Sequence, residues 1–327
     1  MSVLLDPPKA APRILMECSL RPAQGERFQP TGFPSLGAAE FQVGSRTDLL
    51  VESPQSIANR LESVAWDEAR GDLVELLDGL PYVVTTVGGR ATDSIREAHR
   101  LNSPYLVHGF AAETDFLSRA GISGTKAKRK AAKSEDVDEG FGVDIRRLAA
   151  AVFYYDPNSV LHGVFLEKIA GLARLTRIIS GFIEAHGVHP AQSGGVKNDR
   201  IDPKGKARGG AAEGFGNVPF VRTEYTADDI KAYFSLDTAL LASYGLGKAA
   251  ERLLIALGLW KILRFLAEGG RLRAACDFDV QDIVITRPAG FELPSIAQLE
   301  DILREEIMHC KDCGIFADPA KTIVLSE

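Results

Sequence analysis

The sequence predicts an α+β protein built on an antiparallel sheet. Strand-like and helix-like segments alternate at the N-terminal end of the chain, and they alternate again at the C-terminal end. The composition agrees, because 327 residues with 45% hydrophobic and 25% charged side chains are typical of a globular protein with a large core. A chain of this length can form one elaborated domain or two ordinary ones.

A helix is predicted to begin after Ser53 and to reach about Ala69. Ser53 suits the N-cap, and Pro54 suits the first helical position because its missing N–H costs nothing there. Helical spacing separates two sets of side chains, namely apolar Ile57, Leu61 and Val64 and polar Gln55, Asn59 and Glu62. The polar set is either an ordinary solvated face or a surface suited to sugar and phosphate oxygens.

The other elements follow from hydrophobic alternation and from turn residues. Strands are expected over residues 14–20, 49–52, 82–87, 218–224 and 271–278, near 283–285, and over 322–325; helices are expected over 144–153 and from 295 to about 310. Asp156 to Ser159 reads as a turn. The helix predicted over 248–268 is apolar almost all round, with Lys261, Arg264 and Glu268 on a narrow polar stripe, so we expect other elements on both sides of it.

The charge distribution is uneven. The net charge of −6 argues against a generic nucleic-acid binder, for which a basic domain is usual. Residues 192–217, however, hold five basic and three acidic side chains among seven glycines. Residues 122–140 carry a basic run followed by an acidic run. Each segment is either a solvated surface loop or a polyanion contact.

Several individual residues allow two interpretations. His99, Arg100 and Asn102 lie in a short span closed by Pro104, and they fit either a phosphate contact or the basic end of a helix. Arg174 and Arg177 interrupt an apolar segment and therefore need phosphate or carboxylate partners. His162, taken alone, is more often a core histidine than a catalytic one.

The sequence gives little support for a metal site, a nucleotide-binding site or a membrane-spanning segment. Cys310 and Cys313 have zinc-type spacing but lack enough partner ligands, and Asp277, Asp279 and Asp282 are more typical of a strand end than of a cation site. No complete phosphate-loop or protease motif is present, so we expect no metal and no cofactor. No apolar run is long enough to cross a bilayer and no secretion signal is visible, so we expect a cytoplasmic protein without a disulfide framework.

Four strings resemble a known family. The runs RFQPTGF from Arg27, VESPQSIANRLE from Val51, HRLNSPY from His99 and SGGVKND from Ser193 are similar to the RAMP-type backbone subunit of type I-G (formerly I-U) CRISPR surveillance complexes, called Cascade. The resemblance implies one RAMP domain over 1–327, with an RRM-like (ferredoxin-like) palm and insertions projecting at 122–140 and 192–217.

The resemblance also implies a function. The protein would be a non-enzymatic subunit that polymerises along a CRISPR RNA and presents it for pairing with invading DNA. Its partners would be the CRISPR RNA, the paired target strand, other copies of itself and other Cascade subunits. Sequence-independent contacts to RNA phosphates and 2′-hydroxyls would fall to Arg27, Gln29, Thr31, Ser53, Gln55, Asn59, Arg60, His99, Arg100, Asn102, Arg174, Lys197 and Arg200.

Two other functions remain open from the sequence. One is a RAMP-type endoribonuclease that processes CRISPR RNA, with His99 or His162 as the general base on a ribose 2′-hydroxyl. The other is a protein-binding module whose basic loops meet nucleic acid only incidentally.

Overall fold

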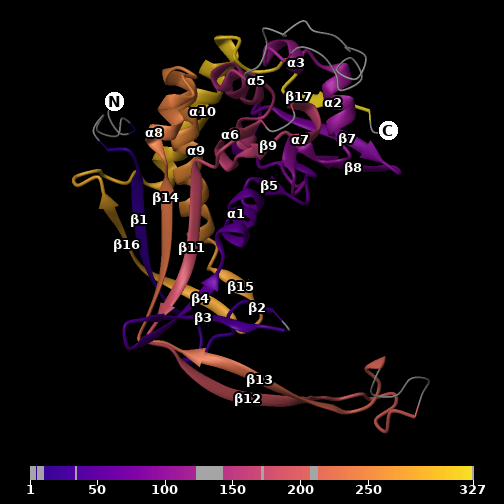
Figure 1. The fold of residues 1–327 in the computed structure, drawn as a ribbon, viewed down its shortest axis with the longest axis vertical. Coiled ribbons are helices and arrows are strands. Elements are labelled where there is room, and N and C mark those ends of the chain that lie inside the picture. The colour runs from indigo at the N-terminus through magenta and orange to yellow at the C-terminus, as the bar shows by residue number, and fades with distance from the viewer. Residues whose placement is uncertain are drawn as a thin grey trace, which may run out of the picture.

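The computed structural model describes residues 5, 11–33, 35–122, 143–170, 173–206 and 213–325. The chain has the outline of a C, with a helical head, a tall sheet as its back and a long hairpin arm at its foot (Figure 1). The strands are β1 (Ile14–Pro22), β2 (Gly32–Phe33), β3 (Gly37–Val43), β4 (Arg46–Glu52), β5 (Trp66–Asp67), β6 (Asp72–Leu73), β7 (Tyr82–Val87), β8 (Arg90–Asp93), β9 (Val164–Phe165), β10 (Arg174–Leu175), β11 (Ile179–His186), β12 (His189–Lys197), β13 (Val218–Thr226), β14 (Asp229–Leu236), β15 (Arg271–Arg273), β16 (Cys276–Arg287) and β17 (Lys321–Ile323). The helices are α1 (Pro54–Ser63), α2 (Val107–Glu113), α3 (Phe116–Arg119), α5 (Ile145–Tyr155), α6 (Pro157–His162), α7 (Glu167–Ala170), α8 (Thr238–Ser243), α9 (Lys248–Ala267) and α10 (Ile296–Asp312), with short 3-10 turns η1 (Glu75–Leu77) and η2 (Arg100–Asn102).

The large sheet has eight strands in the order β15-β16-β1-β14-β11-β4-β3-β2, and all its pairings are antiparallel. Four neighbouring strands, β16, β1, β14 and β11, occupy positions two to five of this order and are called the central strands. The segment from β1 to β11 includes α1, α5 and α6, a hairpin connection joins β11 to β14, and α9 lies between β14 and β16. The predicted α+β class with an antiparallel sheet is therefore confirmed.

One face of the central strands is buried under helices. Burial alternates strictly along β1, β11 and β14, as expected for strands with one buried face. Helix α9 is buried on nearly every side, as its sequence predicts. The predicted polar stripe on this helix is wrong at one position, because Lys261 is only 1% exposed and finds buried polar partners instead of solvent.

The helix after Ser53 ends earlier than predicted. The Ser53 hydroxyl accepts a hydrogen bond from the Ser56 amide at 3.3 Å, which confirms the N-cap. The helix stops at Ser63 instead of Ala69, because Trp66 is drawn into the core, where its ring meets Tyr82 edge-on at 6.2 Å. Tertiary packing here overrides helix propensity.

The prediction of a single strand over 271–278 is also wrong in detail. It is a hairpin of β15 and the start of β16, turned at Ala275 with a φ of 59°. The strand expected near 283–285 belongs to the same long β16.

The predicted turn at Asp156 is the first turn of α6. The Asp156 carboxylate caps this helix, accepting from the Ser159 amide at 3.0 Å and from its hydroxyl at 2.6 Å, and Pro157 occupies the first helical position. Asp156 is fully buried, and burial raises the pKa of its carboxyl group to about 6.

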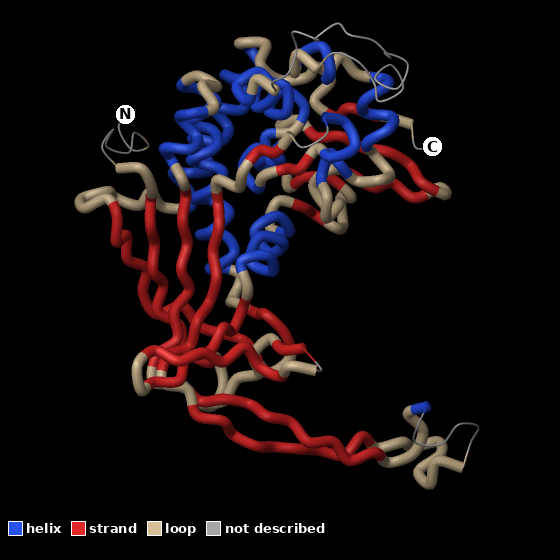
Figure 2. Tube along the Cα trace, viewed as in Figure 1, coloured by secondary structure: helices blue, strands red, loops and turns tan. Residues whose placement is uncertain are grey.

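The arm is a hairpin of β12 and β13, paired in register from His189–Thr226 to Lys197–Val218 (Figure 2). Its root is tied to the loop before β2. The backbone groups of Phe28 and Tyr225 exchange two hydrogen bonds of 2.9 Å, and the Arg27 guanidinium pairs with Glu224 at 3.1 Å. The described parts of the segment 192–217 form the outer arm, whereas 123–142 lies outside the described residues. None of the helices in the described ranges is long and apolar enough to cross a bilayer.

The buried Asp156 predicts a particular pH dependence of stability. Because the pKa of the Asp156 carboxyl group is higher in the folded protein than in the unfolded chain, the folded protein binds the carboxyl proton more tightly. The resulting stabilisation is present below pH 4 and is lost as the pH rises through about 6. A rise from 3.8 to about 6 corresponds to about 3 kcal/mol. In urea unfolding, the difference in unfolding free energy between wild type and Asp156→Asn should therefore fall by about this amount between pH 4 and 7. A difference that stays constant over this range would contradict the assignment.

Candidate nucleic-acid interface

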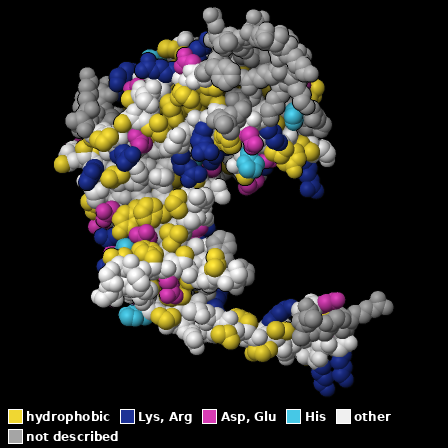
Figure 3. All heavy atoms as spheres, viewed as in Figure 1, with side chains coloured by type: hydrophobic (Ala, Val, Ile, Leu, Met, Phe, Trp, Pro, Cys, Tyr) yellow, Lys and Arg dark blue, Asp and Glu magenta, His cyan; other side chains and the backbone are white. Residues whose placement is uncertain are grey.

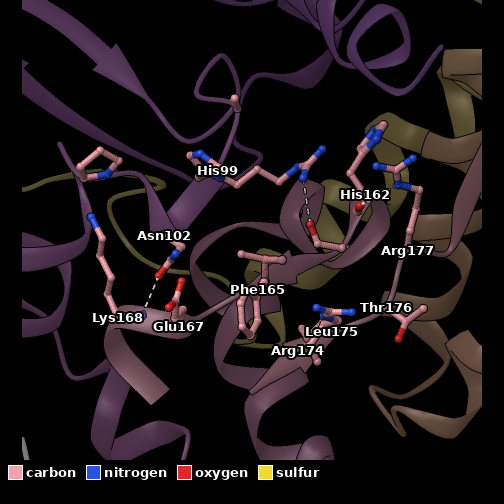
Figure 4. A pocket seen from close by; sticks show the side chains of 15 residues that line it. His99, Asn102, His162, Phe165, Glu167, Lys168, Arg174, Leu175, Thr176 and Arg177 are labelled. Atoms are coloured by element: carbon pink, nitrogen blue, oxygen red, sulfur yellow. Dashed lines mark hydrogen bonds between the residues drawn. The ribbon is translucent and has the colours of Figure 1, made fainter. Parts of the chain in front are cut away.

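A pocket of about 570 Å³ opens in the head, where η2 meets the β9–β10 hairpin (Figure 4). Lys, Arg and His side chains gather on this part of the head, above the hollow of the C (Figure 3). Six basic side chains and one carboxylate line the pocket: His99, Arg100, His162, Lys168, Arg174 and Arg177, with Glu167. The structure thus brings together four predicted site residues, His99, Arg100, Asn102 and Arg174, from two segments about seventy positions apart.

Two of these cations are available to a ligand. Arg174 is exposed, and its guanidinium lies 4.9 Å from the centroid of the Phe165 ring, a cation–π contact that leaves its other face open. Lys168 is exposed on the short α7. Its backbone amide donates to Asn102 Oδ1 at 3.2 Å, which fixes the Asn102 amide at the pocket wall. No sequence pattern sets Lys168 apart from other surface lysines, so sequence reasoning missed it.

Arg100, by contrast, acts as a brace. Its Nε and Nη2 each donate to the Glu62 carboxylate at 2.7 Å, and its Nη1 donates to the Gly163 carbonyl at 3.0 Å. The pair is almost buried, with side-chain exposures of 11% and 10%. Such a bidentate contact fixes geometry as well as charge, so Arg100 holds η2 against α1.

Glu62 is the first of a series of buried polar side chains that are linked by hydrogen bonds. Its Oε1 accepts from Asn158 Nδ2 at 3.1 Å, and Asn158 Oδ1 accepts from the Lys261 ammonium. Burial lowers the pKa of Lys261 to about 8, so at neutral pH it is mainly charged and donates to His162 Nε2 at 3.1 Å. Burial and the nearby Lys261 charge hold the pKa of His162 well below its usual value. His162 is therefore a neutral core residue with its basic nitrogen occupied.

Arg177 connects the pocket to the start of α1. Its Nε donates to the His162 carbonyl at 3.3 Å and its Nη1 to the Pro54 carbonyl at 3.2 Å. Burial, with the nearby Arg100 charge, lowers the pKa of Arg177. Arg177 therefore links the pocket wall to the first turn of α1.

The predicted residues of α1 divide into two groups. Gln55 and Asn59 are exposed one turn apart, which fits both a solvated face and a ligand-facing one. Ser53 is occupied as the N-cap. Arg60 turns toward the sheet, where its guanidinium donates to the carbonyls of Arg271 at 3.2 Å and Leu272 at 2.6 Å, and burial lowers its pKa.

The predicted residues of the first loop serve the fold in this structure. Arg27 pairs with Glu224 of the arm. The backbone N–H of Gln29 donates to the Ala275 carbonyl at 2.7 Å, and the backbone N–H of Thr31 donates to the Val51 carbonyl at 3.2 Å. The loop therefore ties the arm to the back of the C.

Lys197 and Arg200 lie far from the pocket. Both are exposed on the outer arm, where the Lys197 ammonium donates to the Gly214 carbonyl at 2.6 Å. Across the described ranges, no three His, Cys, Asp or Glu side chains gather closely enough to hold a metal ion. Of the two cysteines with zinc-type spacing, Cys310 is buried and Cys313 is exposed.

The pocket floor requires glycine at position 163. Gly163 has a φ of 79°, and a Cβ added there would lie 2.8 Å from the Arg177 nitrogen and 2.9 Å from the Leu175 carbonyl oxygen. Such a position penalises any L side chain both sterically and conformationally.

We expect Gly163→Ala to destabilise the protein by roughly 2 kcal/mol more than Gly314→Ala in urea unfolding. Gly314 is the matched control, because its φ of 68° is also positive but an added Cβ meets nothing within 4 Å. Equal losses in the two variants would show that the close approach at the pocket floor is unimportant.

Comparison with known proteins gives one informative match. Residues 14–190, more than half of the chain, match the model of a family described as CRISPR-associated protein GSU0053. No curated protein matches the sequence. Among the solved structures that match is a chain of one titled "CRISPR RNA-guided surveillance complex, pre-nicking", at 14% identity and a TM-score of 0.42, covering 83% of this chain and 75% of that chain.

Proposed function

The chain belongs to the family of CRISPR-associated protein GSU0053, and from that membership we propose that it is a non-enzymatic RNA-binding subunit of a type I-G CRISPR interference complex. Several copies bind along one CRISPR RNA and present it for pairing with a strand of invading DNA, beside the other Cascade subunits. The resemblance of the four sequence strings to RAMP-type backbone subunits supports the finer assignment.

The observation that carries the proposal is the surface chemistry beside the hollow of the C. Lys168 and Arg174 carry positive charge to the pocket, and Gln55 and Asn59 on α1 add neutral amides. Charged groups of this kind bind phosphates, and amides bind ribose hydroxyls and phosphate oxygens, without reading the base sequence. A subunit that repeats along a guide of variable sequence needs this kind of recognition.

The strand order supports an RRM-like (ferredoxin-like) palm. The central strands β16-β1-β14-β11 follow the chain as fourth, first, third and second, with helical segments after the first and third. This is the connectivity of a split βαββαβ unit. The arm is then an insertion between its second and third strands.

The proposal predicts that the two pocket cations bind phosphates. Lys168→Ala/Arg174→Ala should weaken single-stranded RNA binding roughly tenfold at about 0.1 M salt. The slope of log affinity against log salt should become shallower by about 1.4, about 0.7 for each lost phosphate contact. Fluorescence anisotropy with two guide RNAs of unrelated sequence measures both effects.

The matched control for this measurement is Arg264→Ala/Arg304→Ala. It also removes two exposed side-chain charges, but these lie on α9 and α10 and do not line the pocket. The control should leave the salt slope unchanged. Equal losses in the control and pocket variants would mean that binding follows net charge alone. A pocket variant with unchanged RNA affinity would contradict RNA binding at the pocket.

The endoribonuclease alternative is tested separately. His99 is exposed at the pocket, whereas His162 has its basic nitrogen facing Lys261, so His99 is the histidine to replace. We expect wild type and His99→Ala alike to leave a CRISPR repeat RNA uncut on a denaturing gel. Cleavage by wild type that disappears in His99→Ala would replace the binding proposal with an enzymatic one.

A further inference from the structure

A second pocket, of about 290 Å³, opens in the head where α3 and α5 meet the loops before α9 and after α10. In Figure 1, α3 and α5 lie at the top of the head, away from the hollow of the C, so we call this cavity the upper pocket. No residue that the sequence predicts to bind RNA is among its described lining residues. The upper pocket is therefore separate from the larger pocket beside β9 and β10.

The wall of the upper pocket is mainly apolar. Side chains from α5 and from the two loops form it, namely Ala150, Ala151, Phe153, Leu246 and Ile315. Ala150 is exposed in the middle of α5, so its small side chain leaves space that a larger one would fill. The volume lies at the lower limit of small-molecule sites, roughly 300–1,000 Å³. This size fits one large apolar side chain.

Two guanidinium groups line the same pocket. The Cζ of Arg119 lies 3.6 Å from the centroid of the Tyr154 ring, and its Nε donates to Asp115 at 2.7 Å. The Nη2 of Arg147 donates to the Ser118 carbonyl at 3.3 Å. Neither the Nη groups of Arg119 nor Nη1 of Arg147 donates a hydrogen bond within the described ranges. The pocket thus presents N–H donors that neighbouring groups hold in place and that remain unused.

The carboxylates nearest to these arginines already have partners. Asp144 caps α5 and accepts from the backbone N–H groups of Arg146 and Arg147 at 2.9 and 3.2 Å. Asp115 accepts from Arg119. Three guanidinium groups therefore accompany two carboxylates in this part of the head, and the surplus charge is positive.

We propose that the upper pocket binds another protein subunit of the interference complex, through a segment that places one large apolar side chain next to a carboxylate. The apolar side chain fills the space beside Ala150, and the carboxylate accepts from Arg119 and Arg147. The inference rests on the proposed function, in which the chain works beside other subunits.

Charge and shape both favour a protein segment. Guanidinium groups match carboxylates in geometry as well as in charge. An apolar anchor in a pocket, with polar groups around it, is typical of the strongest contacts in protein interfaces. A nucleotide fits less well, because the apolar side chains of the wall offer no hydrogen-bonding group to a base edge.

Native mass spectrometry of a complex reconstituted from the full-length chain, its CRISPR RNA and the other subunits tests this site. Ala150→Trp fills the pocket, and Arg119→Glu/Arg147→Glu reverses its charge. In each variant, the concentration of one other subunit that half-saturates the complex should rise roughly tenfold. The number of copies of this chain per RNA should stay at the wild-type value.

The matched control is Arg264→Glu/Arg304→Glu, which reverses two exposed charges on α9 and α10. Arg264 pairs with Glu268 four positions away, as Arg119 pairs with Asp115. The control should retain every subunit at wild-type concentrations. Equal losses in the control and in the charge-reversed pocket variant would show that net charge, and not the pocket, retains the subunit.

A cross-link identifies the bound segment. With the photoreactive residue benzoylphenylalanine in place of Leu246, irradiation of the assembled complex should join the chain to the same subunit. The cross-linked peptide should contain a large apolar residue next to an aspartate or glutamate. Replacing that acidic residue with arginine should restore binding to Arg119→Glu/Arg147→Glu.

The contrary outcomes are distinguishable. If both pocket variants retain every subunit like wild type, the docking site is wrong while the RNA-binding function stands. If they lower the RNA affinity of the chain alone, the upper pocket binds nucleic acid instead. A cross-link from position 246 to another copy, or to the acidic run within 122–140, would overturn the proposed occupant. If wild type binds no RNA, the proposed function fails, whereas loss of one subunit in Ala150→Trp would still support the docking site.

Discussion

The pocket depends on the buried ion pair between Arg100 and Glu62. It joins η2 to α1, and through Asn158 and Lys261 it extends to α6 and α9. Each member satisfies a polar group that would otherwise be buried without a partner, and removing one partner of a buried pair typically costs about 3–5 kcal/mol. The exposed cations at the pocket keep their positions because this internal chain fixes the segments that carry them.

Local sequence signals predicted local structure well. Ser53 caps the helix that follows it, as predicted, and α9 is buried as its almost uniformly apolar sequence indicates. The errors arose where distant packing decided the outcome. Trp66 ended a helix that propensity would have continued, and Lys261 entered the core because Asn158 and His162 supplied partners about one hundred residues away.

The candidate site was predictable only in part, because distant packing also decides which of its side chains are free to meet a ligand. Sequence reasoning identified Arg174 and Asn102, which line the pocket, but it could not tell an arginine that meets a ligand from one that meets a carboxylate. In this structure Arg27, Arg60 and Arg100 all contact other elements, through Glu224, two backbone carbonyls and Glu62 respectively. That distinction depends on tertiary pairing, which no single stretch encodes.

The number of residues in its two strands sets how far the arm reaches. Each of its strands has nine residues, so at about 3.3 Å per residue the ribbon spans about 30 Å from its clamped root. Side chains alternate between the two faces of a ribbon, so removing two residues from each strand shortens it by about 7 Å without exchanging the faces, whereas removing one exchanges them. Evolution can therefore change the reach of the arm only in paired steps if its surface chemistry is to be kept.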